Sequence, residues 1–181
     1  MIVVCPYVGY KITADFSLYA QDVLGFDEVS SSILGTGTIW MRPIFALSAG
    51  FLADKISGVK VISISFLLSC LGGFLLFFGW VDGGLVASLL NLTAISAGIF
   101  GIRGVYFAIM GDSKINYAKT GTAVGVISVL GYTPDVFMSP LMVYLLDNYP
   151  GIQGHQYVFG VLALFSLCGF IASLFFKKLK T

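Results

Sequence analysis

Long apolar stretches follow one another along the chain, and short clusters of charged residues, glycine or proline separate them. Val61 to Trp80 contains no ionisable residue in 20 positions, and Tyr157 to Phe176 repeats this pattern. As a helix, either stretch is about 30 Å long and matches the hydrocarbon core of a bilayer. Because lipid offers no hydrogen-bond partners to the backbone, these stretches are predicted to be helices and not strands.

Six spans of this kind are predicted when the chain is divided at its charged, glycine and proline clusters. The pattern indicates an all-α, polytopic membrane helical bundle that occupies residues 1–181 as one unit. The predicted spans are residues 2–25, 29–53, 61–80, 84–110, 120–146 and 156–176.

The composition excludes a soluble globular protein and predicts the lipid bilayer as the surroundings. Hydrophobic residues make up 57% of the chain and charged residues 10%, whereas a soluble domain carries about 25% charged residues. Cys5, Cys70 and Cys168 lie in apolar segments at unrelated spacings, so we interpret them as buried small hydrophobic residues. Without a phosphate-binding loop or other catalytic signature, we expect no enzyme activity, cofactor, metal or nucleic-acid partner.

Basic residues occur in alternate connections between the predicted spans. They are Lys55 and Lys60 between spans two and three, Lys114 and Lys119 between spans four and five, and Lys177, Lys178 and Lys180 after span six. The other connections contain no Lys or Arg and hold the acids Asp22, Asp27, Glu28, Asp82 and Asp147. Because positive residues collect on the cytoplasmic side, this alternation predicts an inner or plasma membrane protein with both termini in the cytoplasm.

The connection between spans two and three reads GFLADKISGVK, residues 50–60. It resembles the G-x-L-A-D-[RK] loop signature of the major facilitator superfamily, which recurs between helices eight and nine of those transporters. The signature is matched by Gly50, Leu52, Ala53, Asp54 and Lys55. After Lys55 the chain departs from the pattern, because Ser57-Gly58 replaces a single glycine and Val59 replaces one lysine of the usual basic pair.

This resemblance covers nearly the whole chain as the C-terminal six-helix half of such a transporter. It implies that Gly50, Asp54 and Lys55 form a cytoplasmic gating motif, in which the aspartate latches helix ends in one conformation and releases them in the other. From the residues alone, Gly50 allows close helix approach near the membrane surface. The alternative is a solvated loop that sets topology and has no switching role.

Five ionisable residues lie inside the predicted spans, where an unpaired charge costs several kcal/mol. They are Lys11, Asp15, Arg42, Arg103 and Asp135. Lys11 and Asp15 are four residues apart and share a helix face with Tyr7, so a contact between them along the helix is feasible. Either these charges line a polar cavity, or they neutralise one another as structural pairs.

The spacing of the other three charges places them deep in the bilayer. Arg42 lies near the midplane, and Pro43 after it is expected to loosen the helix. Arg103 and Tyr106 are three residues apart and are predicted to face the same cavity. Asp135 lies between Pro134 and Pro140, so its helix is predicted to be bent or locally unwound, as at the substrate sites of transporters.

We interpret these residues as parts of a solute site. Arg42, Arg103, Tyr106, Lys11 and Tyr7 are the predicted substrate-binding residues, while Asp135 or Asp15 carries a coupling proton or balances charge. The three basic and two acidic residues inside the spans leave one excess positive charge, which favours an anionic solute. The stretches RGVYFAIMGDSK and GYTPDVFMSP resemble the sugar-phosphate and sugar-acid permeases. His155, the single histidine, is interpreted as an interfacial residue.

The resemblance implies secondary transport of a small organic solute by alternating access between two six-helix halves. Span one begins at Met1 without a basic flank, so we expect the chain to need a missing N-terminal half or a second copy of itself. The alternatives are a non-transporting six-helix membrane subunit and the remnant of a disrupted transporter gene. A third possibility is a small channel, which would require a polar stripe along whole spans, and the isolated charges do not provide one.

Overall fold

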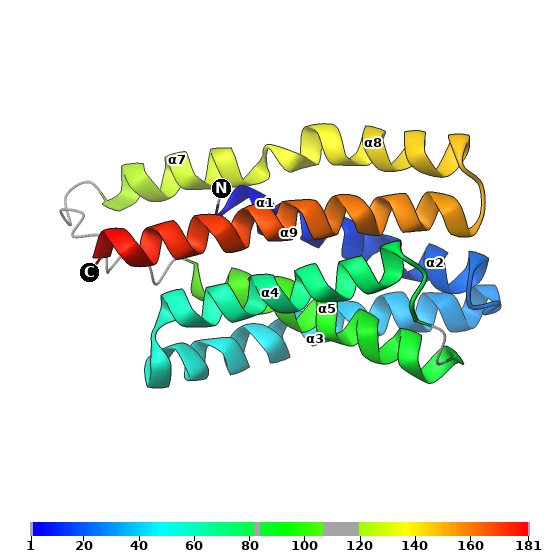
Figure 1. The fold of residues 1–181 in the computed structure, drawn as a ribbon, viewed down its shortest axis with the longest axis horizontal. Helices are drawn as coiled ribbons and strands as arrows, with labels where there is room; N and C mark the ends of the chain where they lie inside the picture. The colour runs from blue at the N-terminus through cyan, green and yellow to red at the C-terminus, as the bar shows by residue number, and fades with distance from the viewer. Residues whose placement is uncertain (1, 82–83, 107–119, 181) are drawn as a thin grey trace.

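The computed structural model describes residues 2–81, 84–106 and 120–180, and its regular structure over these residues is entirely helical. The helices lie along the long axis of the molecule, with α7 and α8 along one edge and α3 along the other (Figure 1). The elements are α1 (Val4–Ile12), the 3-10 turn η1 (Thr13–Asp15), α2 (Phe16–Asp22), α3 (Glu28–Ile56), α4 (Gly58–Phe77), α5 (Gly84–Val105), α7 (Thr120–Tyr132), α8 (Pro134–Asn148) and α9 (Ile152–Lys180). The all-α prediction is confirmed.

Four helical segments of the described chain are long and apolar enough to cross a membrane. They are Gly58–Phe77, Gly84–Val105, Thr120–Asn148 and Ile152–Phe176. The first predicted span is interrupted by η1, and the second, α3, carries four charged residues within its 29 positions. The membrane helices are therefore confirmed, while the count of six spans stays a prediction. Asp82, Lys114, Lys119 and the predicted end of span four lie outside the described residues.

Helix α3 begins at a capped end and continues past its proline. The Asp27 carboxylate accepts a hydrogen bond from the Ser30 amide at 3.4 Å, and hydrogen bonding from Ser30 lowers the pKa of Asp27. Pro43 lies within the helix, and α3 runs on to Ile56, so the expected loosening does not interrupt it. Ser57 alone joins α3 to α4, with a φ angle of 120° that favours glycine.

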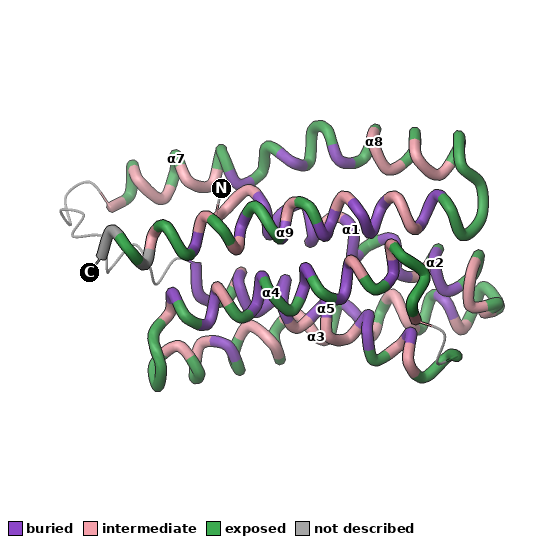
Figure 2. Tube along the Cα trace, viewed as in Figure 1, coloured by how far each residue is buried: buried purple, intermediate pink, exposed green. Residues whose placement is uncertain are grey.

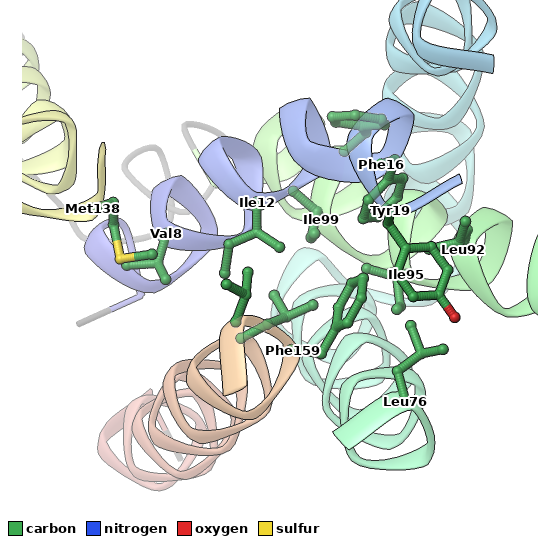
Figure 3. Close-up of a cluster of buried hydrophobic side chains, with 13 residues drawn as sticks. Val8, Ile12, Phe16, Tyr19, Leu76, Leu92, Ile95, Ile99, Met138 and Phe159 are labelled. Carbon is green, nitrogen blue, oxygen red and sulfur yellow. The ribbon is translucent and has the colours of Figure 1, made fainter. Parts of the chain in front are cut away.

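The interior is formed where α4 packs along both α5 and α9, while α1 contacts α5 and α9 and α2 packs against α3. Figure 3 shows side chains from α1, α2, α4, α5, α8 and α9 meeting in one apolar cluster. Its fully buried members include Ile12, Phe16, Ile95 and Phe159. In lipid, such contacts stabilise the bundle through van der Waals packing more than through removal of water.

Glycines let α5 approach its neighbours closely. A β-carbon on Gly98 would lie 2.6 Å from the Ser65 carbonyl oxygen of α4, and one on Gly104 would lie 2.5 Å from the Ala46 carbonyl oxygen of α3. Small residues at helix crossings are the usual means of bringing membrane helices together. Gly104 thus fixes the distance between α3 and α5 next to Arg103.

The outer faces of α3, α7 and α8 carry little protein cover (Figure 2). Gly131 is the one buried residue among those of α7. Helix α7 ends at Tyr132 and α8 begins at Pro134, so the helix is interrupted at Thr133, close to Asp135, while a bend there stays a prediction. The exposed side chains here are largely apolar and are suited to lipid or to further helices; they include Ile33, Trp40, Ile44, Phe51, Val129 and Val136.

We expect Gly104→Ala to destabilise the protein by about 1–3 kcal/mol, because the added methyl group forces α3 away from α5. The measurement is the thermal unfolding of the purified protein in detergent. Gly125→Ala in α7 is the matched control, since a β-carbon there meets no described atom within 4 Å. Equal melting temperatures for the two variants would show that the α3–α5 approach does not depend on Gly104.

A second substitution tests the turn between α3 and α4. Ser57→Gly should raise the stability by about 1 kcal/mol, because glycine removes the strain of a positive φ at a residue with a β-carbon. Ser57→Ala keeps the β-carbon and should give no gain. A gain of the same size in both variants, measured by thermal unfolding, would mean that the effect comes from the lost hydroxyl group.

Candidate functional site

One face of α1 carries the polar and aromatic side chains of the site. Tyr7, Tyr10 and Lys11 are three and four residues apart, so they share a helix face. The Tyr7 and Tyr10 rings lie 6.2 Å apart between centroids. Helix α1 contacts α5, α7, α8 and α9. This position brings the tyrosines close to charged side chains from the neighbouring helices.

Arg103, in the last turn of α5, reaches both tyrosines. Its Nη2 atom donates a hydrogen bond to the Tyr7 hydroxyl at 3.1 Å. Its Cζ atom lies 4.4 Å from the centre of the Tyr7 ring and 4.1 Å from that of Tyr10. These are cation–π distances, so the guanidinium is held by aromatic faces and a hydroxyl group.

Arg42, from the middle of α3, meets the same tyrosine. Its Nη1 atom donates a hydrogen bond to the Tyr10 hydroxyl at 2.6 Å. Its Cζ atom lies 4.5 Å from the centre of the Tyr10 ring and 5.6 Å from that of Phe100. The Arg42 Nε atom is buried and has no hydrogen-bond partner in the described part of the chain. An unsatisfied buried donor on a cation favours an additional acceptor.

A hollow of about 290 Å³ lies beside the two guanidinium groups. Its volume is near the lower end of the range of about 300–1,000 Å³ that ligand pockets occupy. The hollow is partly open, so a ligand can reach the arginines from outside the bundle. Its lining residues are Tyr10, Arg42, Pro43, Ala46, Phe100 and Arg103.

Asp135 neutralises Lys11 and leaves both arginines without a carboxylate. The Lys11 Nζ atom lies 3.3 Å from Asp135 Oδ1, and both side chains are about one-third exposed, at 32% and 40%. Among the described residues, no carboxylate forms an ion pair with Arg42 or Arg103. The site therefore carries two positive charges in excess, one more than the sequence alone indicates.

The contact that the spacing of Lys11 and Asp15 made feasible is not formed, and His155 has partners that the sequence did not predict. Lys11 does not pair with Asp15, because α1 ends at Ile12 and the 3-10 turn rotates Asp15 away from the face of Lys11. Asp15 instead contacts His155. The side chain of His155 is buried within the bundle near the start of α9, at 1% exposed, and the sequence did not predict this burial. A lone histidine gives no local signal of burial, so the sequence could not locate its partners.

The other predicted residues fall into different surroundings. Tyr7 lies against Arg103, and its predicted role in solute binding stays a prediction. Tyr106 is buried in a second apolar cluster with residues that include Val59 and Ile102. Its hydroxyl group shares a hydrogen bond with that of Tyr7 near Arg103, although Tyr106 is not among the residues that line the hollow. Tyr10 and Phe100, which also contact the arginines, were not predicted from the sequence. The helical spacing of Tyr10 from Tyr7 is a signal that could have found it.

The loop motif lies far from this site, at the end of α3. Asp54 and Lys55 are exposed, and neither takes part in the ion pairs of the described residues. A β-carbon on Gly50 would meet no described atom within 4 Å, so the close helix approach expected there is not made within this part of the chain. The gating role of the motif stays a prediction.

The fold and the site define a helical membrane protein with a cationic, aromatic-lined hollow. The chain is 41% identical over 80 residues to the inner membrane protein YihN of Escherichia coli, across 44% of this chain and 19% of YihN. It is 27% identical to the inner membrane protein YqcE of E. coli, across 100% of this chain and 44% of YqcE. It is 29% identical to a probable nitrate transporter, NarT of Staphylococcus aureus, across 82% of this chain and 38% of NarT.

No family model matches the chain, and no solved structure gives a significant match. The chain spans less than half the length of the curated relatives that it matches. The similarity to inner membrane proteins and the long apolar helices together confirm that this is a membrane protein.

A double-mutant cycle tests the Lys11–Asp135 pair. Asp135→Asn should lower thermal stability in detergent, because it leaves Lys11 without its partner in a weakly polar site. Lys11→Gln combined with Asp135→Asn should recover most of the loss, since no unpaired charge remains. If the two losses simply add in the double variant, the pair does not balance charge.

Proposed function

We propose that this chain is one half of a secondary transporter of the major facilitator type, which moves a small organic anion across the membrane by alternating access. The observation that carries the proposal is the pair of guanidinium groups at Tyr10, without a carboxylate partner among the described residues. A cation in a bilayer is costly unless a counter-charge or water accompanies it. An anionic solute supplies the counter-charge.

Arginine suits this role because its planar donor fork matches the oxygen atoms of a carboxylate or phosphate. The Tyr7 hydroxyl accepts a hydrogen bond from Arg103, and the Tyr10 hydroxyl accepts one from Arg42. These bonds orient the two guanidinium groups. The unpartnered Nε of Arg42 provides a further donor. Lys11 lies on the same face of α1 as these tyrosines, and because Asp135 balances its charge it adds nothing to the net charge.

The solute class follows from charge and size. A hollow of about 290 Å³ admits a small anion or a single sugar acid, and one relative is named as a probable nitrate transporter. Nitrate, carboxylate and phosphate share a group of oxygen atoms that accept from guanidinium. We therefore propose an organic oxyanion of the sugar-acid or sugar-phosphate type, and nitrate serves as an inorganic comparison with the same acceptor chemistry.

The proposed working unit contains a second bundle. The outer faces of α3, α7 and α8 are apolar and exposed, and the relatives are more than twice as long as the part matched here. A further six-helix half, or a second copy of the chain, would complete the cavity around the arginines. In this arrangement the bundle contributes six spans, and Asp54 and Lys55 lie on the cytoplasmic side with both termini.

Uptake of labelled anions by membrane vesicles that contain the protein tests the proposal. We expect Arg103→Ala to raise the KM for the transported anion about tenfold to hundredfold, because it removes a charge-assisted hydrogen bond. Nitrate, glucuronate and glucose 6-phosphate are the probes. Lys60→Ala, which removes an exposed cation at the start of α4, is the control and should leave KM unchanged.

Immunoblotting of the vesicles ensures that equal amounts of each variant are compared. An unchanged KM in Arg103→Ala would remove the arginine from the solute site. If the unmodified protein takes up none of the three anions and exchanges none of them, the anion-transporter proposal fails, and the reading as a non-transporting membrane subunit gains support.

A further inference from the structure

A second cluster of ionisable groups lies at the opposite end of the bundle from Lys55. His155, in the first turns of α9, has both ring nitrogens against carboxylates. Its Nδ1 atom lies 3.2 Å from Asp15 Oδ2, and its Nε2 atom lies 3.1 Å from Asp22 Oδ2. The histidine therefore connects α9 to both η1 and α2, the two elements that follow α1.

Burial of this cluster is uneven. The side chains of His155 and Asp15 are 1% and 6% exposed, whereas that of Asp22 is 41% exposed. The Tyr19 ring packs edge-on against the imidazole, with 5.5 Å between centroids. Asp22 thus gives the buried pair a contact with water at this end of the bundle.

The other helices bring no further charge to His155 within the described residues. Helices α4 and α5 carry their charged residues, Lys60 and Arg103, toward their far ends. On α8, Asp135 is paired with Lys11 and Asp147 is exposed. The ionisable groups that face the imidazole are therefore Asp15, Asp22 and the phenol of Tyr19.

The geometry at His155 favours the protonated imidazolium. A neutral imidazole has one N–H group, so it can donate to one carboxylate and must set a lone pair against the other. An imidazolium donates from both nitrogens and satisfies both acceptors, and buried polar groups are costly when left unsatisfied. The two nitrogens lie on different edges of the ring and face separate carboxylates, so they do not converge on one ion. Accordingly, no group able to hold a metal is found among the described residues.

The proton-dependent contact lies on the same interrupted segment as the arginine site. Tyr7, Tyr10 and Lys11 belong to α1, while Asp15 and Asp22 follow in η1 and α2. When the imidazolium loses its proton, one of its two hydrogen bonds is lost and α2 is less firmly held to α9. The 3-10 turn at Thr13–Asp15 is where such a change can pass to α1.

We propose that His155, Asp15 and Asp22 form the proton-binding site of the transporter, which takes up a proton through the exposed Asp22 and couples it to movement of the anion. This inference rests on the proposed function. A negative-inside potential opposes the entry of an anion, and a proton that moves with it cancels the charge. Symport of one proton for each singly charged anion is therefore the expected coupling.

Nuclear magnetic resonance of the chain labelled with ¹⁵N-histidine reads this site directly, because the 181 residues contain one histidine. In lipid bilayers at pH 7.5, we expect the signal of an imidazolium. Asp22→Asn should lower the midpoint of its titration by about one pH unit or more, through loss of a facing negative charge. Asp147→Asn removes an exposed carboxylate of α8 and should leave the midpoint unchanged.

A neutral imidazole throughout pH 5–9, or equal midpoints in the Asp22 and Asp147 variants, would overturn the proton site. This measurement needs no solute, so it is independent of the proposed function. Because Asp22 is partly exposed, its variant tests the site even if substitutions of buried His155 fail to fold.

Transport in vesicles tests the coupling. Asp22→Asn and Asp15→Asn should reduce proton-driven accumulation of the transported anion at least tenfold, while exchange of internal for external label continues without a gradient. The pH dependence of uptake should shift with the midpoint measured by magnetic resonance. Accumulation with an unchanged pH profile in both variants would overturn the coupling, whereas absence of both uptake and exchange in the unmodified protein would refute the transporter itself.

Discussion

Two positive charges meet at the ring of Tyr10, and the arrangement of α1, α3 and α5 depends on how they are held. The Cζ atoms of Arg42 and Arg103 lie 4.5 and 4.1 Å from the centre of this ring. Like charges repel more strongly in a weakly polar interior than in water. Aromatic faces and hydroxyl groups compensate part of this cost, and a bound anion would compensate the rest.

Helix packing holds Arg42 and Arg103 close to the Tyr10 ring. Gly104 lets α5 lie against the backbone of α3 at Ala46, directly beside Arg103. Helix α4 packs along α5 and α9, and α1 reaches the same interior between them. Since apolar contacts between helices gain little from leaving lipid, the fit of small residues at these crossings decides where the charged side chains lie.

The 3-10 turn η1, which interrupts the first predicted span, separates two clusters of charged residues with different electrostatic properties. Helix α1 presents Tyr7, Tyr10 and Lys11 to neighbouring helices, and η1 turns Asp15 toward α9. One cluster has an excess of positive charge and suits an anion, while the other has two carboxylates around one imidazole and suits a proton. An interrupted helix can change shape at its turn with less loss of backbone hydrogen bonding than a continuous one.

The sequence by itself determined the helical class, the apolar segments and the interruption of the helix beside Asp135, because these depend on local composition and on the fixed geometry of a helix. The tertiary structure decided the partners. It paired Lys11 with Asp135 and Asp15 with His155, brought Tyr10 between the arginines, and placed Tyr106 in an apolar cluster. The positive φ also falls on Ser57 and not on the neighbouring glycine. Contacts between distant segments depend on how helices rotate and cross, and neither hydropathy nor spacing within one segment specifies that geometry.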